Sequence, residues 1–168
     1  RILAILLLAA CLLTLLPATA MAVPETETRS KGGKLIALTF DDGPGPYTRR
    51  LLEGLAKRGV KATFFMLGQQ AENYDVTAGL VRDAGHQIAS HTYDHPQLSK
   101  KTDSQVRWQI SHTADILNRI TGYGTHYLVR PPYGDYNSRV LSLLDNPAIL
   151  WSVDPLDWKY RNADTVCT

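Results

Sequence analysis

From Lys34 onward, short apolar runs rich in β-branched and aromatic residues alternate with stretches in which apolar residues recur with helical period. The longest helical stretch covers residues 102–122, where Thr102 or Asp103 is placed to cap the helix and Gly122 to end it. Repeated strand-then-helix units predict parallel strands covered by helices, arranged as a barrel or as an open doubly wound sheet. The predicted strands are Leu35–Phe40, Ala62–Leu67, Gln87–Ser90, Tyr127–Val129 and Ile149–Val153, and the other predicted helices cover residues 47–59, 73–84 and 138–144.

The segment before this domain is an apolar run followed by a cleavage-like sequence. Residues 2–13 are uniformly apolar, and Ala20-Met21-Ala22 has the small residues typical of a cleavage site. The pattern predicts a signal peptide over residues 1–22, a polar linker over 23–33 and a domain over 34–168. We therefore expect a protein that is secreted or held in the cell envelope, with no stable membrane span after cleavage.

Two alternatives for the N-terminal segment are less favoured. A membrane anchor or buried helix would use the same apolar residues, but the run is short for a span. Anchoring as a lipoprotein at Cys11 would leave an apolar mature N-terminus from Leu12 to Pro17. Cleavage after Ala22 leaves Cys167 as the only thiol, so an internal disulfide is not expected.

Length and charge exclude some classes of partner. The 168 residues suit one domain, and the formal net charge is only +2. A chain so close to neutral presents no basic face, so we expect no nucleic-acid partner. Nothing in the sequence indicates an oligomeric state.

Polar clusters follow directly on four of the predicted strands. They are "DDGP" from Asp41, "HTYDH" from His91, "RPPYGD" from Arg130 and "DPLDW" from Asp154. The carboxyl ends of parallel strands share one rim in β/α architectures. We therefore expect these four separate segments to converge on one pocket.

Two of these clusters carry metal-ligating groups. Asp41 and Asp42 should project in different directions, because successive side chains of a strand alternate, so one can bind a cation while the other stays free. His91 and His95 are four residues apart, a spacing that can bring two imidazoles to one face of a helical turn. Together with one carboxylate they would give three ligands that suit zinc and leave a coordination position open for water.

The other two clusters contribute a cation, aromatic rings and further carboxylates. Arg130 could hold a carboxylate in its ionised state, and Tyr133 or its backbone N–H could donate to a developing oxyanion. Trp158 could stack on a sugar, although Trp as core and Asp157 as a turn former is an open alternative. Trp108 lies on a predicted helix, where we expect it to serve in packing. The remaining histidines are interpreted as structural or surface residues: His86, His112 and His126.

In this order, the clusters resemble the motifs of the polysaccharide deacetylase family, also known as the NodB-homology domain or carbohydrate esterase family 4. The resemblance rests on "TFDDGP", "HTYDH", "RPPYG" and "DPLDW", with "KATFF" and "TGY" at similar places, and covers residues 34 to 168. It implies a distorted (β/α) barrel and a metal-dependent hydrolase that removes acetyl groups from sugars. The likeness to N-deacetylases implies an acetylated polysaccharide substrate containing N-acetylglucosamine, such as peptidoglycan or a chitin-like polymer.

The resemblance also implies a role for each motif residue. Asp42, His91 and His95 would bind one divalent ion, most readily Zn²⁺ with Co²⁺ as an alternative, and Asp41 would be the general base. Arg130 would orient and ionise Asp41. The Tyr133 backbone would help form the oxyanion hole and its side chain would contact substrate, Asp157 would orient an acid histidine, and Trp158 would line the substrate groove.

The sequence departs from the family at one motif. The family supplies the proton for the leaving amine from a later Leu-x-His motif, which does not occur between Asp157 and Thr168. We therefore expect a domain that is incomplete at its C-terminus, with an unclosed barrel. Such a polypeptide would bind metal but turn over slowly or not at all.

Two other classes of function stay open on the sequence. One is a non-catalytic carbohydrate-binding pseudoenzyme that keeps the groove without the chemistry. The other is a magnesium phosphohydrolase using the Asp pair, although two ring nitrogens favour zinc over magnesium.

Overall fold

The computed structural model describes residues 35–124 and 126–166, which form a mixed α/β domain around a small parallel sheet. The sheet has the strand order β1-β2-β3, and both neighbouring pairs are parallel. Strands predicted over Ala62–Leu67 and Gln87–Ser90 are confirmed as β2 and β3. The bounds are β1 Thr39–Gly43, β2 Thr63–Met66 and β3 Gln87–Ser90.

The first strand lies further along the chain than predicted. Leu35 and Ile36 are 74% and 91% exposed, whereas pairing of β1 with β2 begins at Thr39 opposite Thr63. A strand extends only where a partner strand is present, and β2 provides none for the first apolar residues of the predicted run. Hydrophobicity alone therefore placed the strand several residues too early.

The last two predicted strands are reduced to single bridges. Val129 pairs with Ser90 on one side and with Ala148 on the other, and neither Tyr127–Val129 nor Ile149–Val153 forms a strand. Pro131 and Pro132 follow directly and cannot donate backbone hydrogen bonds, which ends the pairing. The bridges still carry the parallel order of the sheet beyond β3.

The predicted helices form with adjusted bounds. Thr102 caps the longest one in a capping box with Gln105, and Gly122 ends it in the left-handed conformation, as predicted. The helix predicted over 73–84 is preceded by an unpredicted one, because Tyr74 departs from helical geometry between them. The helices are α1 Thr48–Lys57, α2 Gly68–Asn73, α3 Asp75–Asp83, α4 Asp103–Thr121, α5 Ser138–Leu141, α6 Asp157–Tyr160 and α7 Ala163–Val166, with 3₁₀ turns η1 Leu98–Lys100 and η2 Pro132–Gly134.

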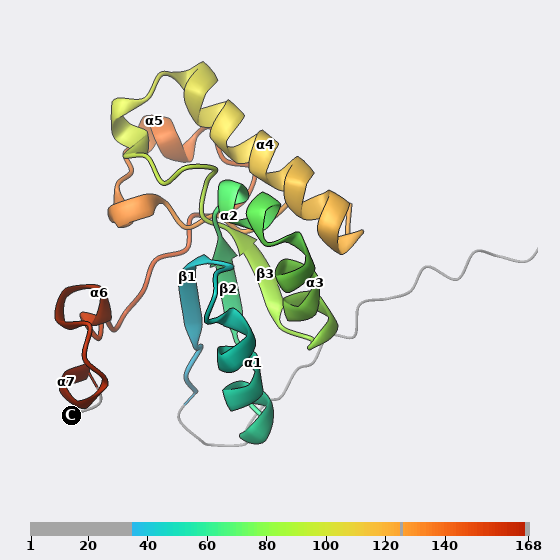
Figure 1. The fold of residues 1–168 in the computed structure, drawn as a ribbon. Coiled ribbons are helices and arrows are strands. Elements are labelled where there is room, and N and C mark those ends of the chain that lie inside the picture. The colour runs from blue at the N-terminus through green and yellow to red at the C-terminus, as the bar shows by residue number, and fades with distance from the viewer. Residues whose placement is uncertain (1–34, 125, 167–168) are drawn as a thin grey trace, which may run out of the picture. The chain divides into compact units, whose positions relative to one another are not determined.

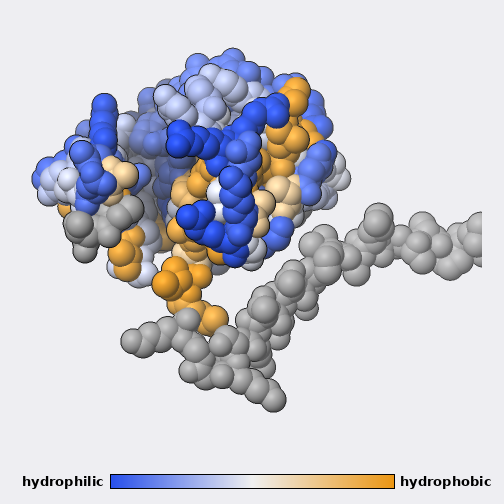
Figure 2. All heavy atoms as spheres, turned by 60° about the horizontal axis from the view of Figure 1, so that its bottom comes forward, coloured by the Kyte–Doolittle hydropathy of each residue, from blue (hydrophilic) through white to orange (hydrophobic). Residues whose placement is uncertain are grey.

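The core lies between the sheet and its covering helices. Helices α1 and α3 pack side by side, α3 contacts β3, and α4 packs across α2 and α3 (Figure 1). Figure 2 views the end from which β1 begins and shows apolar side chains on the surface among polar ones. No helix in the described part of the chain is long and apolar enough to cross a membrane. The buried core includes Leu52, Leu55, Phe64, Met66, Val81, Ile88, Ile116 and Leu117.

Candidate metal centre

A local irregularity in β1 orients its two carboxylates. The pairing of β1 with β2 steps from Phe40 opposite Phe64 to Gly43 opposite Met66, so Asp41 and Asp42 together face one residue of β2. Such a bulge redirects side chains from simple alternation. Asp42 also has a left-handed φ of 65°. This conformation adds to the bulge in turning the Asp42 side chain away from that of Asp41.

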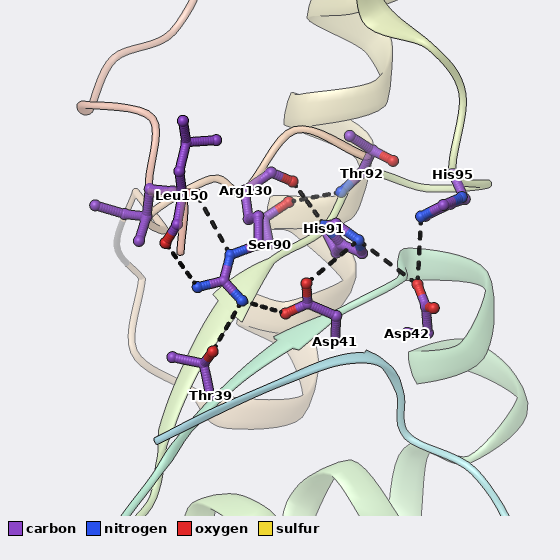
Figure 3. A network of polar contacts seen from close by, with 10 residues as sticks. Thr39, Asp41, Asp42, Ser90, His91, Thr92, His95, Arg130 and Leu150 are labelled. Atoms are coloured by element: carbon purple, nitrogen blue, oxygen red, sulfur yellow. Dashed lines mark hydrogen bonds and ion pairs between the residues drawn. The ribbon is translucent and has the colours of Figure 1, made fainter. Parts of the chain in front are cut away.

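Asp42 meets both histidines of the second cluster. Its Oδ1 lies 3.5 Å from His91 Nε2 and 3.4 Å from His95 Nε2, and the three ligand atoms all lie within 4.8 Å of one another (Figure 3). Ligand atoms at about 2.0–2.1 Å from a tetrahedral zinc are separated by about 3.3 Å. The two measured separations fit that edge length, so these residues suit a single divalent cation.

The two histidines are not presented from a helical turn, and that part of the prediction is wrong. Residues 91–95 form an irregular loop after β3, in which Thr92 and His95 have φ values of 71° and 63°. The imidazoles approach each other edge to face, with ring centroids 5.0 Å apart. The four-residue spacing therefore works through a folded loop instead of a helix face.

The tautomer of His91 is set by its backbone partner. Its Nδ1 lies 2.7 Å from the carbonyl oxygen of Arg130, and because a carbonyl only accepts, Nδ1 carries the proton. Nε2 is then left with its lone pair facing Asp42. Burial lowers the pKa of His91 below the ordinary value, while the nearby Asp41 carboxylate acts in the opposite direction. The buried imidazole is therefore neutral at pH 7, the form that binds a metal.

Asp41 is held by a buried guanidinium. Arg130 is 3% exposed, and its NH1 donates to Asp41 Oδ1 at 2.6 Å and to Thr39 Oγ1 at 3.0 Å (Figure 3). The other nitrogens of Arg130 donate to the carbonyl oxygens of Ile149 and Leu150. Because the guanidinium takes Oδ1, Asp41 presents Oδ2 toward His91, whose Nε2 is 3.9 Å away.

Part of this support could have been found in the sequence. Thr39 stands two positions before Asp41, and residues two apart lie on the same face of a strand. The carbonyl groups of Ile149 and Leu150 carry no sequence signal, because any residue supplies them. The Phe65 ring that lies 3.9 Å from the guanidinium carbon was also missed.

Tyr133 borders the same site from the turn that follows Arg130. Its φ of 59° places a non-glycine residue in the left-handed region, a conformation that costs about 1–3 kcal/mol and tends to occur at functional sites. Its ring lies edge to face with that of His95, with centroids 4.5 Å apart, and the residue as a whole is 64% exposed. The exposed ring is available to a substrate.

Asp157 and Trp158 are placed differently. They lie at the start of α6, where Trp158 is 65% exposed and its indole nitrogen lies 3.4 Å from Asp154 Oδ2. Within the described residues, none of the hydrogen bonds given for Trp158 reaches the trio Asp42, His91 and His95. Their proposed roles stay predictions.

The remaining predicted residues have structural surroundings. His86 is buried and accepts a hydrogen bond from the backbone N–H of Ala62. Trp108 is 47% exposed, and it packs by stacking on His112 with Tyr93 against both rings. Trp108 therefore packs at the surface of α4, whereas Ile116 and Leu117 of the same helix lie in the core.

The fold and the site together define a protein class. A family model described as polysaccharide deacetylase matches residues 28–147, and the chain belongs to this family. The sheet with its covering helices is a partial barrel of the deacetylase type.

Two curated relatives that are similar in sequence are named as deacetylases. The chain is 40% identical over 147 residues to peptidoglycan-N-acetylmuramic acid deacetylase PdaC of Bacillus subtilis, covering 87% of this chain and 31% of PdaC. It is 42% identical over 135 residues to a peptidoglycan-N-acetylglucosamine deacetylase of Bacillus cereus, covering 78% of this chain and 49% of that protein. The chain therefore spans less than half the length of either relative.

Solved structures of deacetylase-family proteins have a similar fold. The structure of PdaC matches with a TM-score of 0.77 at 41% identity, covering 80% of this chain and 67% of that one. A wild-type CE4 family pseudoenzyme of Bacillus anthracis, BA3943, matches with a TM-score of 0.74 at 29% identity, covering 80% of this chain and 49% of that one. Both active and inactive relatives thus share the fold, so activity has to be argued from the site.

Proposed function

We propose that this chain is a zinc-dependent hydrolase that removes N-acetyl groups from a polysaccharide containing N-acetylglucosamine, such as peptidoglycan or a chitin-like polymer. The observation that carries the proposal is the convergence of Asp42, His91 and His95 beside Asp41, a carboxylate held by a buried arginine. The relatives named as peptidoglycan deacetylases support the substrate class.

The donor set favours zinc. Two imidazole nitrogens and one carboxylate oxygen suit Zn²⁺, with Co²⁺ as an alternative, whereas Mg²⁺ prefers oxygen ligands alone. Asp42, His91 and His95 would hold the ion. When bound, such an ion supplies a Lewis acid that polarises a carbonyl and lowers the pKa of water to about 7.

Asp41 is the proposed general base. Arg130 orients Asp41 through Oδ1, which leaves Oδ2 on the side of the trio to accept a proton from the attacking water. The water would attack the acetyl carbonyl carbon, and the C–N bond would break as the amine gains a proton from the acid histidine that the family carries in its later Leu-x-His motif. The backbone N–H of Tyr133 would donate to the developing oxyanion.

The residues of α6 would act on substrate binding. Trp158 offers an exposed indole that could stack on a sugar face, and Asp157 precedes it as a candidate for orienting the group that protonates the amine. Both roles rest on motif position.

We also propose export, with cleavage after Ala22. The support is the apolar run and the Ala-x-Ala sequence, both of which lie outside the described residues. Mass spectrometry of the protein recovered from the producing cell's envelope or medium should show an N-terminus at Val23. An intact mass that includes residues 1–22 would contradict this.

Metal content and acetate release test the enzymatic proposal. Equilibrium dialysis should find one zinc bound for each chain, and a chelator should remove it. The protein as its gene encodes it should then release acetate from peptidoglycan or chitooligosaccharide only after zinc is restored. Absence of bound zinc, acetate release that survives the chelator, or phosphate release without acetate release would each overturn the proposal.

A further inference from the structure

The loop that carries both histidines is clamped between two helices. Its residues 91–95 belong to no helix or strand, and Thr92 and His95 both have left-handed φ values. Non-glycine residues keep this conformation only where surrounding groups impose it. The position of His95 therefore depends on what holds the backbone between the two ligands.

On one side, the loop meets the N-terminus of α2. The backbone N–H of Gly68 donates to the carbonyl of Thr92 at 2.9 Å, and that of Gln69 donates to the carbonyl of Tyr93 at 3.1 Å. A Cβ at Gly68 would lie 2.8 Å from both Tyr93 Cδ2 and Thr113 Oγ1. Two successive carbonyl groups of the loop are thus satisfied by closely packed backbone.

On the opposite side, the loop meets a single side chain of α4. Gln109 Oε1 accepts from the backbone N–H of Tyr93 at 2.8 Å and from that of Asp94 at 3.3 Å. Gln109 Nε2 donates to Asp94 Oδ1 at 2.7 Å. Gln109 is 5% exposed, so water cannot readily replace these bonds.

We propose that Gln109 is a positioning residue for the metal centre, acting through the backbone of Tyr93 and Asp94 to place His95. The inference rests on the proposed metal site. The two peptide groups between Thr92 and Asp94 donate to Gln109 and accept from α2, so their planes cannot rotate independently. If the bonds from Gln109 are lost, the peptide group between Tyr93 and Asp94 is free to rotate. Asp94 directly precedes His95, so the position of His95 is then no longer fixed.

Reversing the polarity of the amide–carboxylate pair tests this placement. Gln109→Glu sets a carboxylate against Asp94, whereas Asp94→Asn keeps an Oδ1 acceptor for Gln109. In the double variant, the amide introduced at position 94 can donate to the carboxylate introduced at position 109, and the net charge equals that of the original chain. Gln69→Glu, at an exposed position of α2, is the control for added negative charge.

The probe is Co²⁺ or Zn²⁺ alone, with the dissociation constant and the visible Co²⁺ spectrum measured at a temperature where circular dichroism shows every variant folded. We expect Gln109→Glu to weaken metal binding about tenfold, in the range seen when support of a ligand is lost. Asp94→Asn should weaken metal binding less than Gln109→Glu does, and the double variant should recover the original affinity and spectrum. If added negative charge acted only by attracting the cation, Gln109→Glu would tighten metal binding. Tighter binding is the result expected for Gln69→Glu.

Three results would decide against the inference. They are unchanged or tighter binding by folded Gln109→Glu, weakening by Gln69→Glu equal to that by Gln109→Glu, and failure of the double variant to recover. Should Gln109→Glu not fold, the folded double variant decides alone, because recovery of affinity supports the placement and loss of affinity opposes it. If the original chain itself binds neither ion, the proposed function fails, which is a separate outcome.

Discussion

Asp41 and Asp42 are adjacent in the chain but have different surroundings. Asp41 is paired with the buried Arg130, whereas the Asp42 side chain is 64% exposed and faces two imidazoles. The bulge in β1 separates the two carboxylates in space. Each can therefore take one of the two roles that a metal hydrolase needs, ligand or base.

The same chemical change at these neighbours should give different results. In the protein as its gene encodes it, Asp41→Asn should reduce acetate release by about 10²–10⁴-fold, the usual contribution of a general base, and leave zinc binding intact. Asp42→Asn should lose zinc as well as activity, because a neutral amide is a poorer ligand. Zinc dialysis and acetate assays on both variants separate the roles. Equal loss of zinc in the two variants would contradict the assignment.

At the scale of elements, short strands and a few tight contacts hold the site. β2 and β3 each have four residues, so the ends of the sheet depend on turns and on helix packing. The turn before β3 is one such place, because His86 Nδ1 accepts a hydrogen bond from Ala62 N–H at 3.2 Å. The accepting nitrogen has to be unprotonated.

This hydrogen bond predicts a pH dependence of stability. Burial, and to a smaller extent Lys61, lower the pKa of His86 below its ordinary value of 6.5. At pH values between the lowered pKa of folded His86 and the ordinary value of 6.5, the unfolded chain binds more protons than the folded chain. The contribution of His86 to the free energy of unfolding is therefore lost as the pH falls below 6.5. The difference in free energy of unfolding between the original chain and His86→Gln should shrink from pH 7.5 to pH 5.5 in urea titrations.

Comparison of the original chain with His86→Gln controls for the titration of other groups. His91 titrates in both proteins, so subtraction leaves the contribution of His86. A difference that stays constant across the pH range would show that His86 does not titrate in this way.

A pair of glycine substitutions tests the contact between α2 and the histidine loop. Gly68→Ala would force a Cβ against Tyr93 and Thr113, and we expect a loss of about 1–3 kcal/mol in the free energy of unfolding. Gly54→Ala, inside α1, would meet only the flexible end of Arg58 and should raise stability by about 0.5–1 kcal/mol. Chemical denaturation of the two variants measures both signs. Equal effects would mean that the close approach at Gly68 is relieved without cost.

At the scale of the molecule, the candidate metal centre joins distant parts of the chain. Asp42 belongs to β1, whereas His91 and His95 follow β3, about fifty residues later. The ligands therefore meet only in the folded chain. Cation binding should stabilise the whole domain and not a local segment.

Zinc should accordingly raise the free energy of unfolding. At a free zinc concentration of one hundred times the dissociation constant, the expected gain is about 2.7 kcal/mol. Denaturation with and without a chelator measures it, and Asp42→Asn is the matched variant that should show no gain. Stabilisation of the same size in Asp42→Asn would point to zinc bound elsewhere.

Local sequence determined much of this protein. The alternation of apolar runs and helical stretches predicted β2, β3, α1 and α4, and the capping residues predicted both ends of α4. These features depend on side-chain periodicity and on groups within one turn of the helix end, which neighbouring residues determine. Three of the four polar clusters, those that begin at Asp41, His91 and Arg130, meet as the shared rim of parallel strands predicted. For the fourth, from Asp154, the hydrogen bonds found among the described residues are local.

Tertiary structure decided the rest. The start of β1 depends on where β2 offers a partner, and the strand predicted over Tyr127–Val129 is reduced to bridges at Val129, just before Pro131 and Pro132. The bulge at Asp41 and Asp42, the folded loop between the histidines and the bonds from Gln109 all arise from pairing between residues far apart in the chain. Such contacts leave no periodic signal, because each partner lies on a different element and is chosen by packing.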